Sequence, residues 1–157
     1  SDLLLRVNRG HNVEKSRWAI EETARRGIHV GGHLILGLPG EKQSDYLHTA
    51  RELADWPLES VKFHQLQLIK GTAMAREFEK EPGDFPSFTL EEYLDLMMEI
   101  VELLPPRLVI ERIAGELTPG MGLREGWGLR YDGVLKAFEK LLEEEDSWQG
   151  KKFLARK

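Results

Sequence analysis

Apolar and polar positions follow two different periods along the chain, and each change of period marks a new element. Apolar residues that recur every three or four positions predict helices over 13–26, 44–56, 89–104 and 132–145. Short runs rich in apolar and β-branched residues predict strands over 28–37, 60–69 and 107–113. Because strands and helices alternate, we expect an α/β fold with a parallel sheet, adjacent strands and right-handed crossovers.

Capping signals support the helix boundaries. Asn12 is placed to cap the first helix, and Thr89 with Glu92 has the spacing of a capping box. The stretches 71–88 and 115–128 contain prolines or glycines without an apolar period, so we expect both to be irregular loops.

The first two strands differ in how they distribute polar residues. The first, IHVGGHLILGL, has little polar alternation, which is typical of a strand buried on both faces in a parallel sheet. Its glycine pair, Gly31 and Gly32, indicates close approach by another backbone or a ligand. The second strand carries polar groups on both faces, including Lys62 and His64, which favours a ligand-lined cavity such as a barrel lumen.

Charge, apolar runs and cysteine content limit the function classes. Acidic residues outnumber basic ones by 27 to 22, for a net charge of -5, so we expect no general nucleic-acid binding. No apolar run approaches the ~20 residues that span a bilayer, and no signal peptide begins the chain, so we expect a soluble, cytoplasmic protein. The absence of cysteine excludes disulfides, a thiolate nucleophile and a thiolate metal site. The segment 146–157 is expected to be a solvated polar tail.

The sharpest local motif is ILGLPGE, residues 35–41, at the carboxyl end of the first strand. In α/β folds, ligands bind beyond the carboxyl ends of the strands. Gly37 and Gly40 would let a ligand approach the main chain. A tight strand-to-helix turn without any ligand is an equally good interpretation of the same residues.

Several segments together resemble one enzyme superfamily. Asn8-Arg9-Gly10-His11, followed by a helix and then His33-Leu34-Ile35-Leu36-Gly37-Leu38-Pro39-Gly40-Glu41, resembles the fifth βα unit of radical S-adenosylmethionine (radical SAM) enzymes. Lys62-Phe63-His64-Gln65-Leu66 and Lys70-Gly71-Thr72 resemble the sixth strand and its loop, and Glu111-Arg112-Ile113 also fits. The pattern is most similar to bacterial Fe–S oxidoreductase-like members related to the Elp3 and coproporphyrinogen-oxidase groups.

This resemblance implies a fold, cofactors and contacts. Residues 1–142 would form the C-terminal part of a partial TIM-type radical SAM barrel, with Ile35, Gly37 and Leu66 beside the adenine of S-adenosylmethionine. The complete protein would use a [4Fe–4S] cluster, held by three cysteines, to cleave S-adenosylmethionine reductively to a 5′-deoxyadenosyl radical. Because this chain has no cysteine, we expect it to be a piece of the enzyme that is inactive by itself and binds neither cofactor.

Side chains that could face the substrate in the barrel lumen are His33, Lys62, His64 and Arg112. Each has a structural alternative. His33 could be a hydrogen-bonded core histidine, and the pair on the second strand could lie at a solvated edge. Arg112 could hold a carboxylate or phosphate of a ligand, or form an ordinary salt bridge with Glu111 or Glu116. Histidine and carboxylate spacings match no zinc pattern, so no metal site is expected.

Rival functions and partners follow from the same residues. A noncatalytic α/β ligand-binding or interaction module is the main alternative, whereas a hydrolase or phosphotransferase lacks every usual nucleophile or phosphate-loop motif. The substrate remains unknown from sequence. The first strand would present an unpaired apolar edge, so we expect the chain to self-associate.

Overall fold

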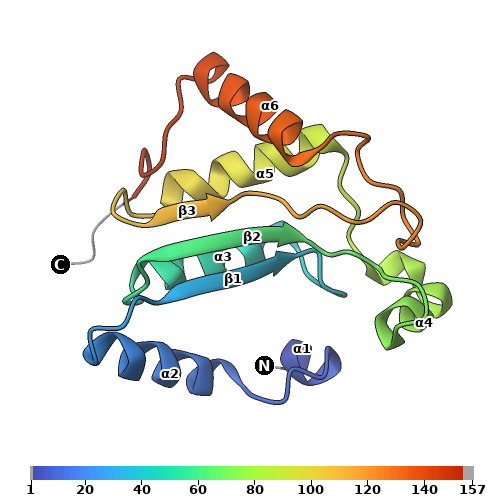
Figure 1. The fold of residues 1–157 in the computed structure, drawn as a ribbon, viewed down its shortest axis with the longest axis horizontal. Coiled ribbons are helices and arrows are strands. Elements are labelled where there is room, and N and C mark those ends of the chain that lie inside the picture. Colours follow the sequence, from blue (N-terminus) through green and yellow to red (C-terminus); the bar gives the residue numbers. More distant parts are fainter. Residues whose placement is uncertain (1, 154–157) are drawn as a thin grey trace.

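A three-stranded parallel sheet organises the protein in the computed structural model, which describes residues 2–153 (Figure 1). Its strands, hydrogen-bonded in sequence order, are β1 (Gly31–Leu36), β2 (Ser60–Gln65) and β3 (Val109–Arg112). The helices are α1 (Asp2–Arg6), α2 (Val13–Arg25), α3 (Gln43–Ala54), α4 (Ala73–Lys80), α5 (Leu90–Leu103) and α6 (Tyr131–Glu144), with a 3-10 turn, η1 (Pro82–Asp84). The predicted α/β fold with adjacent parallel strands is therefore confirmed.

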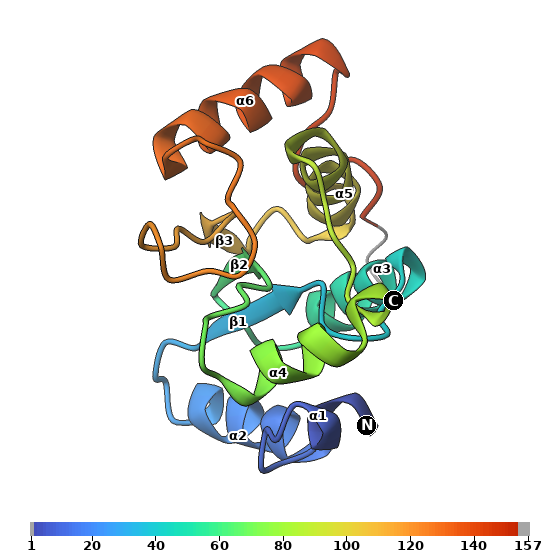
Figure 2. The same ribbon diagram turned by 90° about the vertical axis from the view of Figure 1, so that its right-hand side faces the viewer.

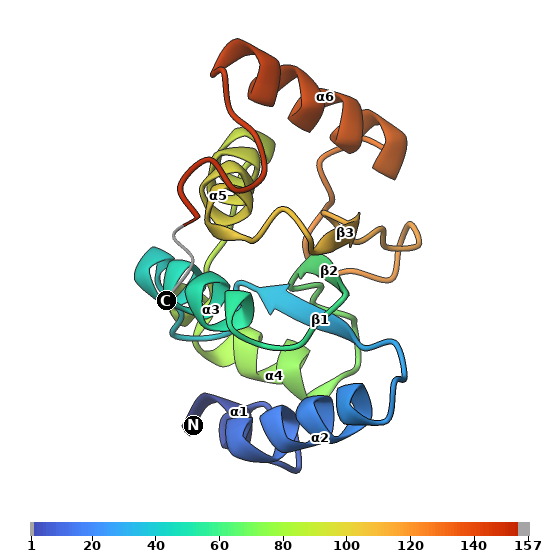
Figure 3. The same cartoon turned by 90° about the vertical axis from the view of Figure 1, so that its left-hand side faces the viewer.

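One face of the sheet forms the core. The side chains of Leu36, Val61 and Phe63 point to this face and are almost completely buried. They pack against α5, whose Tyr93 and Met97 are fully buried. Helices α3 and α5 contact each other and lie on this side of the sheet, with α6 packed on α5 (Figures 2 and 3).

The other face of the sheet is not covered by a helix of the described chain, and we call it the open face (Figure 2). Its residues are Gly31, His33 and Ile35 of β1, Ser60, Lys62 and His64 of β2, and Val109, Glu111 and Arg112 of β3. Because β1 is exposed at alternate positions, the expectation that this strand is buried on both faces is wrong for the described chain. Its glycines do allow close approach, since a Cβ on Gly31 would lie 2.9 Å from Ser60 Oγ.

Helix caps agree with the sequence in two places. Asn12 Oδ1 accepts a hydrogen bond from Lys15 N at 3.0 Å and begins α2. At α5, Glu92 N donates to Thr89 Oγ1 and Thr89 N donates to Glu92 Oε2, which is the expected capping box. The strands are shorter than predicted, and Ile28, at the start of the first apolar run, is exposed and lies outside β1.

Helix α1 was not predicted, and two further segments differ from the sequence prediction. The stretch 71–88 is not wholly irregular, because α4 occupies its first half and is capped by Thr72 Oγ1, which accepts from Ala75 N at 3.1 Å. The expected polar tail, 146–157, folds back on the end of α5 as far as residue 153. Gly150 N donates to Val101 O at 3.0 Å, and Ser147 Oγ donates to Glu102 Oε1 at 2.8 Å. Residues 154–157 of that predicted tail lie outside the described residues.

No described helix combines the length and apolar character needed to cross a bilayer. The predicted loop over 115–128 contains no helix or strand element in the structure. One isolated bridge, between Ile69 and Gly122, ties this loop to the chain that follows β2. Two long connections are thus held together at the carboxyl ends of β2 and β3.

Candidate functional site

The turn that follows β1 is closed by a carboxylate. Glu41 Oε2 accepts hydrogen bonds from Gly37 N at 3.1 Å and from Leu38 N at 2.7 Å. Gly37 has a φ of 92°, and a Cβ there would lie 3.2 Å from the Phe88 ring. Backbone conformation and packing therefore both require glycine at this position, whether or not a ligand binds.

Burial has a marked effect on Glu41. It raises the pKa of this carboxyl to about 7, although the N–H groups of Leu38 and Gly37 oppose the shift by stabilising the ionised form. Asp45, nearby at the start of α3, raises the pKa further. The turn thus contains a titratable group that changes charge near neutral pH.

The three predicted adenine contacts meet at the carboxyl end of the sheet. Ile35 is the last open-face residue of β1, and 48% of its surface is exposed. Leu66 continues the ladder beyond β2, since its N donates to Leu36 O at 2.7 Å. Its Cβ lies 3.8 Å from the position that a Cβ on Gly37 would take. The structure therefore brings an exposed apolar side chain, a glycine turn and a half-buried leucine to one place.

The predicted substrate-facing residues also lie together, on the open face. His33 is paired in register with Lys62, and Lys62 with Arg112. The rings of His33 and His64 are 4.9 Å apart between centroids and nearly perpendicular, at 89°. His33 is exposed, so the alternative of a core histidine is wrong.

Arg112 does not form the salt bridges that were its structural alternative. Glu111 instead pairs with Lys62, at 2.9 Å between Nζ and Oε2, and Glu116 accepts from Tyr131 N at 2.5 Å. The Arg112 guanidinium lies over the Tyr131 ring, 5.1 Å from its centroid. A register irregularity between Val61 and Lys62 brings Arg112 opposite Lys62.

The potential around His64 is positive. Burial lowers the pKa of the His64 imidazole, and the neighbouring His33, Arg112 and Lys62 lower it further. The pKa of the exposed Glu111 is also lowered, first by a hydrogen bond from Ser60 and then by Lys62, so this carboxylate stays ionised. Basic groups therefore outnumber the acid that lies among them.

Sequence reasoning missed the contact that fixes the loop after β3. Gln65 Nε2 donates to Gly115 O, and Gly115 N donates to Gln65 Oε1, both at 2.9 Å. A Cβ on Gly115 would lie 2.5 Å from His64 Nδ1, so a larger residue here would force the His64 ring to move. The sequence signal for this pair of hydrogen bonds was the polar Gln65 on the otherwise apolar core face of β2.

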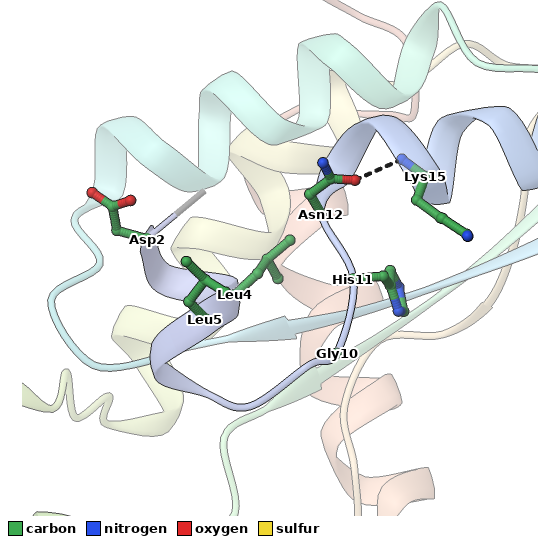
Figure 4. Close-up of a pocket in the computed structure, with 7 residues that line it drawn as sticks. All are labelled: Asp2, Leu4, Leu5, Gly10, His11, Asn12 and Lys15. Carbon is green, nitrogen blue, oxygen red and sulfur yellow. Dashed lines mark hydrogen bonds between the residues drawn. The ribbon is translucent and has the colours of Figure 1, made fainter.

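The described residues contain no group of three His, Cys, Asp or Glu side chains that could hold a metal ion. A separate hollow of about 570 Å3 lies between α1 and the start of α2, lined partly by Leu5, His11 and Lys15 (Figure 4). Asn12 also lines it, but its side chain is already engaged in capping α2. This hollow shares no lining residue with the open face.

Comparison with known proteins identifies the family. Residues 58–144 match the family model described as the Radical_SAM C-terminal domain. Protein YtqA of Bacillus subtilis is 32% identical over 149 residues, which are 95% of this chain and 46% of YtqA. The chain belongs to the Radical_SAM C-terminal domain family.

The radical SAM chain is also similar to a tRNA-modifying enzyme and to a solved structure. A tRNA-2-methylthio-N(6)-dimethylallyladenosine synthase of Chlorobium phaeobacteroides is 30% identical over 114 residues, covering 68% of this chain and 26% of the synthase. The structure of Methanocaldococcus infernus Elp3 with an N-terminal deletion (1-46) matches with a TM-score of 0.79 and 19% identity, covering 94% of this chain and 34% of that one. This likeness confirms the fold. The radical SAM chain spans about half the length of YtqA.

The residues present fit one of the two family cofactors. Full-length radical SAM relatives imply S-adenosylmethionine and an iron–sulfur cluster. An exposed Ile35 beside Gly37 and Leu66 offers an apolar surface that suits an adenine ring. The chain has no cysteine, so its own residues do not fit the thiolate ligand set of a [4Fe–4S] cluster.

Proposed function

We propose that this chain forms the adenine-side and substrate-side wall of the active site in a radical SAM oxidoreductase. The observation that supports it best is the position of Ile35, an exposed apolar residue at the carboxyl end of β1, next to the basic residues of the open face. When bound in the complete protein, S-adenosylmethionine supplies the hydrogen-abstracting chemistry of the family.

Apolar packing is the main contribution of this wall to the cofactor. The N–H groups of Gly37 and Leu66 already donate to Glu41 and Leu36, so neither is free for the adenine. The Ile35 side chain, in contrast, is exposed to solvent, and covering its apolar surface with the adenine ring would be favourable. Gly37, which carries no side chain, and the neighbouring Leu66 would then border that surface.

The substrate side is assigned to the basic residues. Ile35 is paired in register with His64, so the apolar and basic parts of the open face are direct neighbours. A substrate that contacts His33, Lys62, His64 or Arg112 would thus lie next to the adenine end of the cofactor.

Substitution of Ile35 tests the proposal in the full-length protein with its cluster. Ile35→Ala should weaken S-adenosylmethionine binding about tenfold, a loss of ~1.4 kcal/mol that fits removal of a partly buried apolar side chain. Val109→Ala is the matched control, because Val109 is an exposed apolar residue at the opposite end of the same face. Calorimetry that gives equal affinities for the two variants would contradict the proposal.

A noncatalytic α/β ligand-binding or interaction module remains the second candidate function. It is favoured by one observation, that φ and packing at Gly37 explain the glycine turn without any ligand. We further propose that the isolated chain is inactive and binds no cluster, because it lacks thiolates. Anaerobic iron–sulfide reconstitution of the isolated chain tests this, and stoichiometric incorporation of a cluster would overturn it.

A further inference from the structure

The basic residues of the open face differ in how far their charge is already neutralised. Lys62 is paired with Glu111 at 2.9 Å, so its charge is largely balanced locally. Within residues 2–153, the Arg112 guanidinium makes no ion pair and no side-chain hydrogen bond. Arg112 is therefore the cation of this face that still has its hydrogen-bond donors available.

Arg112 is nevertheless held in place. Its guanidinium carbon Cζ lies over the Tyr131 ring, 5.1 Å from the centroid, so a cation–π contact restrains this side chain. A guanidinium presents its N–H donors as a planar fork that matches carboxylate or phosphate oxygens. An arginine that is restrained by an aromatic ring and has no acidic partner among the described residues is thus suited to receive an anion.

Neighbouring groups add donors at the same place. His64 lies close enough to Arg112 to feel its charge, and the His33 ring is 4.9 Å from that of His64. Gln67 Nε2 is buried without a hydrogen-bond partner among the described residues. It lies 3.1 Å from the position of a Cβ on Gly115, and His64 Nδ1 lies 2.5 Å from the same point. An unsatisfied amide donor therefore borders the histidine pair.

We infer that Arg112, assisted by His64 and His33, forms a subsite that binds an anionic group of the substrate, a carboxylate or a phosphate. This inference rests on the proposed function, because it takes the open face to be the substrate side of the site. The subsite lies beside Ile35, the register partner of His64, so the anionic group would be anchored next to the adenine surface. The proposed subsite thus narrows the substrate to molecules that carry a carboxylate or a phosphate.

The test uses the full-length protein, with its histidines labelled with 13C, titrated with inorganic phosphate at constant ionic strength. The His33 and His64 resonances should shift with phosphate, and those of His48 should not, because His48 lies on α3. Arg112→Gln should raise the phosphate dissociation constant at least about tenfold. Arg112→Lys should raise it less, because lysine keeps the positive charge. A parallel titration with acetate shows whether the subsite prefers a phosphate or a carboxylate.

Arg51→Gln is the matched control, since it removes the same charge from an exposed position on α3. Its phosphate affinity should stay within about twofold of the unmodified protein. If Arg112→Gln binds phosphate as Arg51→Gln does, or if phosphate shifts neither His33 nor His64, the subsite does not exist. Unchanged His48 and His11 resonances in the Arg112 variants would show that the fold is intact.

A second arm distinguishes the substrate from the cofactor, which also carries a carboxylate. Arg112→Gln should leave the affinity for S-adenosylmethionine within about twofold, in contrast to Ile35→Ala. An equal loss in both variants would assign the anion to the cofactor and overturn the substrate assignment. If Arg112 controls phosphate binding but Ile35→Ala leaves S-adenosylmethionine binding unchanged, the proposed function fails while the anion subsite stands.

Discussion

Three residues at the carboxyl end of β1, Ile35, Gly37 and Glu41, differ in whether the fold itself explains them. Ile35 is exposed where a buried side chain was expected, whereas Gly37 and Glu41 are fixed by the turn itself. The first residue is therefore a candidate for ligand contact, and the other two are explained by folding. Substitutions can separate these roles.

Glu41 should make stability depend on pH. Its pKa is about 7 in the folded protein against 4.5 ordinarily, so the folded state holds the extra proton between these values. The contribution to stability is therefore present below about pH 4.5 and lost as the pH rises through 7. Glu41→Gln keeps a carbonyl acceptor but cannot ionise, so it should be more stable than the parent at pH 8 by about 1–3 kcal/mol.

Urea unfolding of the parent and of Glu41→Gln at pH 5 and pH 8 measures this difference. The difference should be clearly smaller at pH 5 than at pH 8, because most of the stability is lost between these two values. A constant difference at both values would mean that Glu41 does not titrate in this window.

Gly37→Ala should destabilise the protein by about 1–3 kcal/mol, because alanine resists a positive φ and its methyl group would crowd Phe88. Gly83→Ala is the control, since Gly83 has ordinary φ and open space around its Cβ position. Thermal unfolding compares the two variants. Equal melting temperatures would show that the turn relaxes around the added methyl group without cost.

At the scale of elements, most of the fold was predictable from sequence. Helix and strand periods identified the elements around the sheet, and their order gave the parallel topology. Helix α4 was missed because Pro82, Gly83 and Pro86 dominate the composition of that stretch, and only the Thr72 cap marks its start. The clustering of His33 with His64 needed the register of β1 against β2, which no local pattern encodes.

The cap of α4 can be tested by itself. Thr72→Ala removes the acceptor for Ala75 N and should cost about 1 kcal/mol of stability. Thr72→Ser retains the hydroxyl and should restore most of the loss. Chemical unfolding of the three proteins measures the effect, and a serine variant as unstable as the alanine variant would argue against capping as the cause.

At the scale of the whole molecule, β1 pairs with β2 on one side, and no other described segment pairs with its second edge. Together with the open face, this edge is a template for association. We therefore predict that the isolated chain self-associates, and that Ile35→Lys, which adds a charge beside the edge, weakens the association. Light scattering over a concentration series measures both. A monodisperse monomer at every concentration would contradict the prediction.

The return of residues 147–153 to the end of α5 decides where a label attached within this segment would lie. Gln149 Nε2 donates to Pro105 O and Leu108 O, just before β3 begins. Residues 147–153 therefore lie near the amino ends of the strands, away from the carboxyl end of β1 (Figure 1). A biotin or fluorophore attached within residues 147–153 would lie away from the carboxyl end of the sheet, so immobilisation through this segment suits surface-based measurements of the proposed S-adenosylmethionine binding.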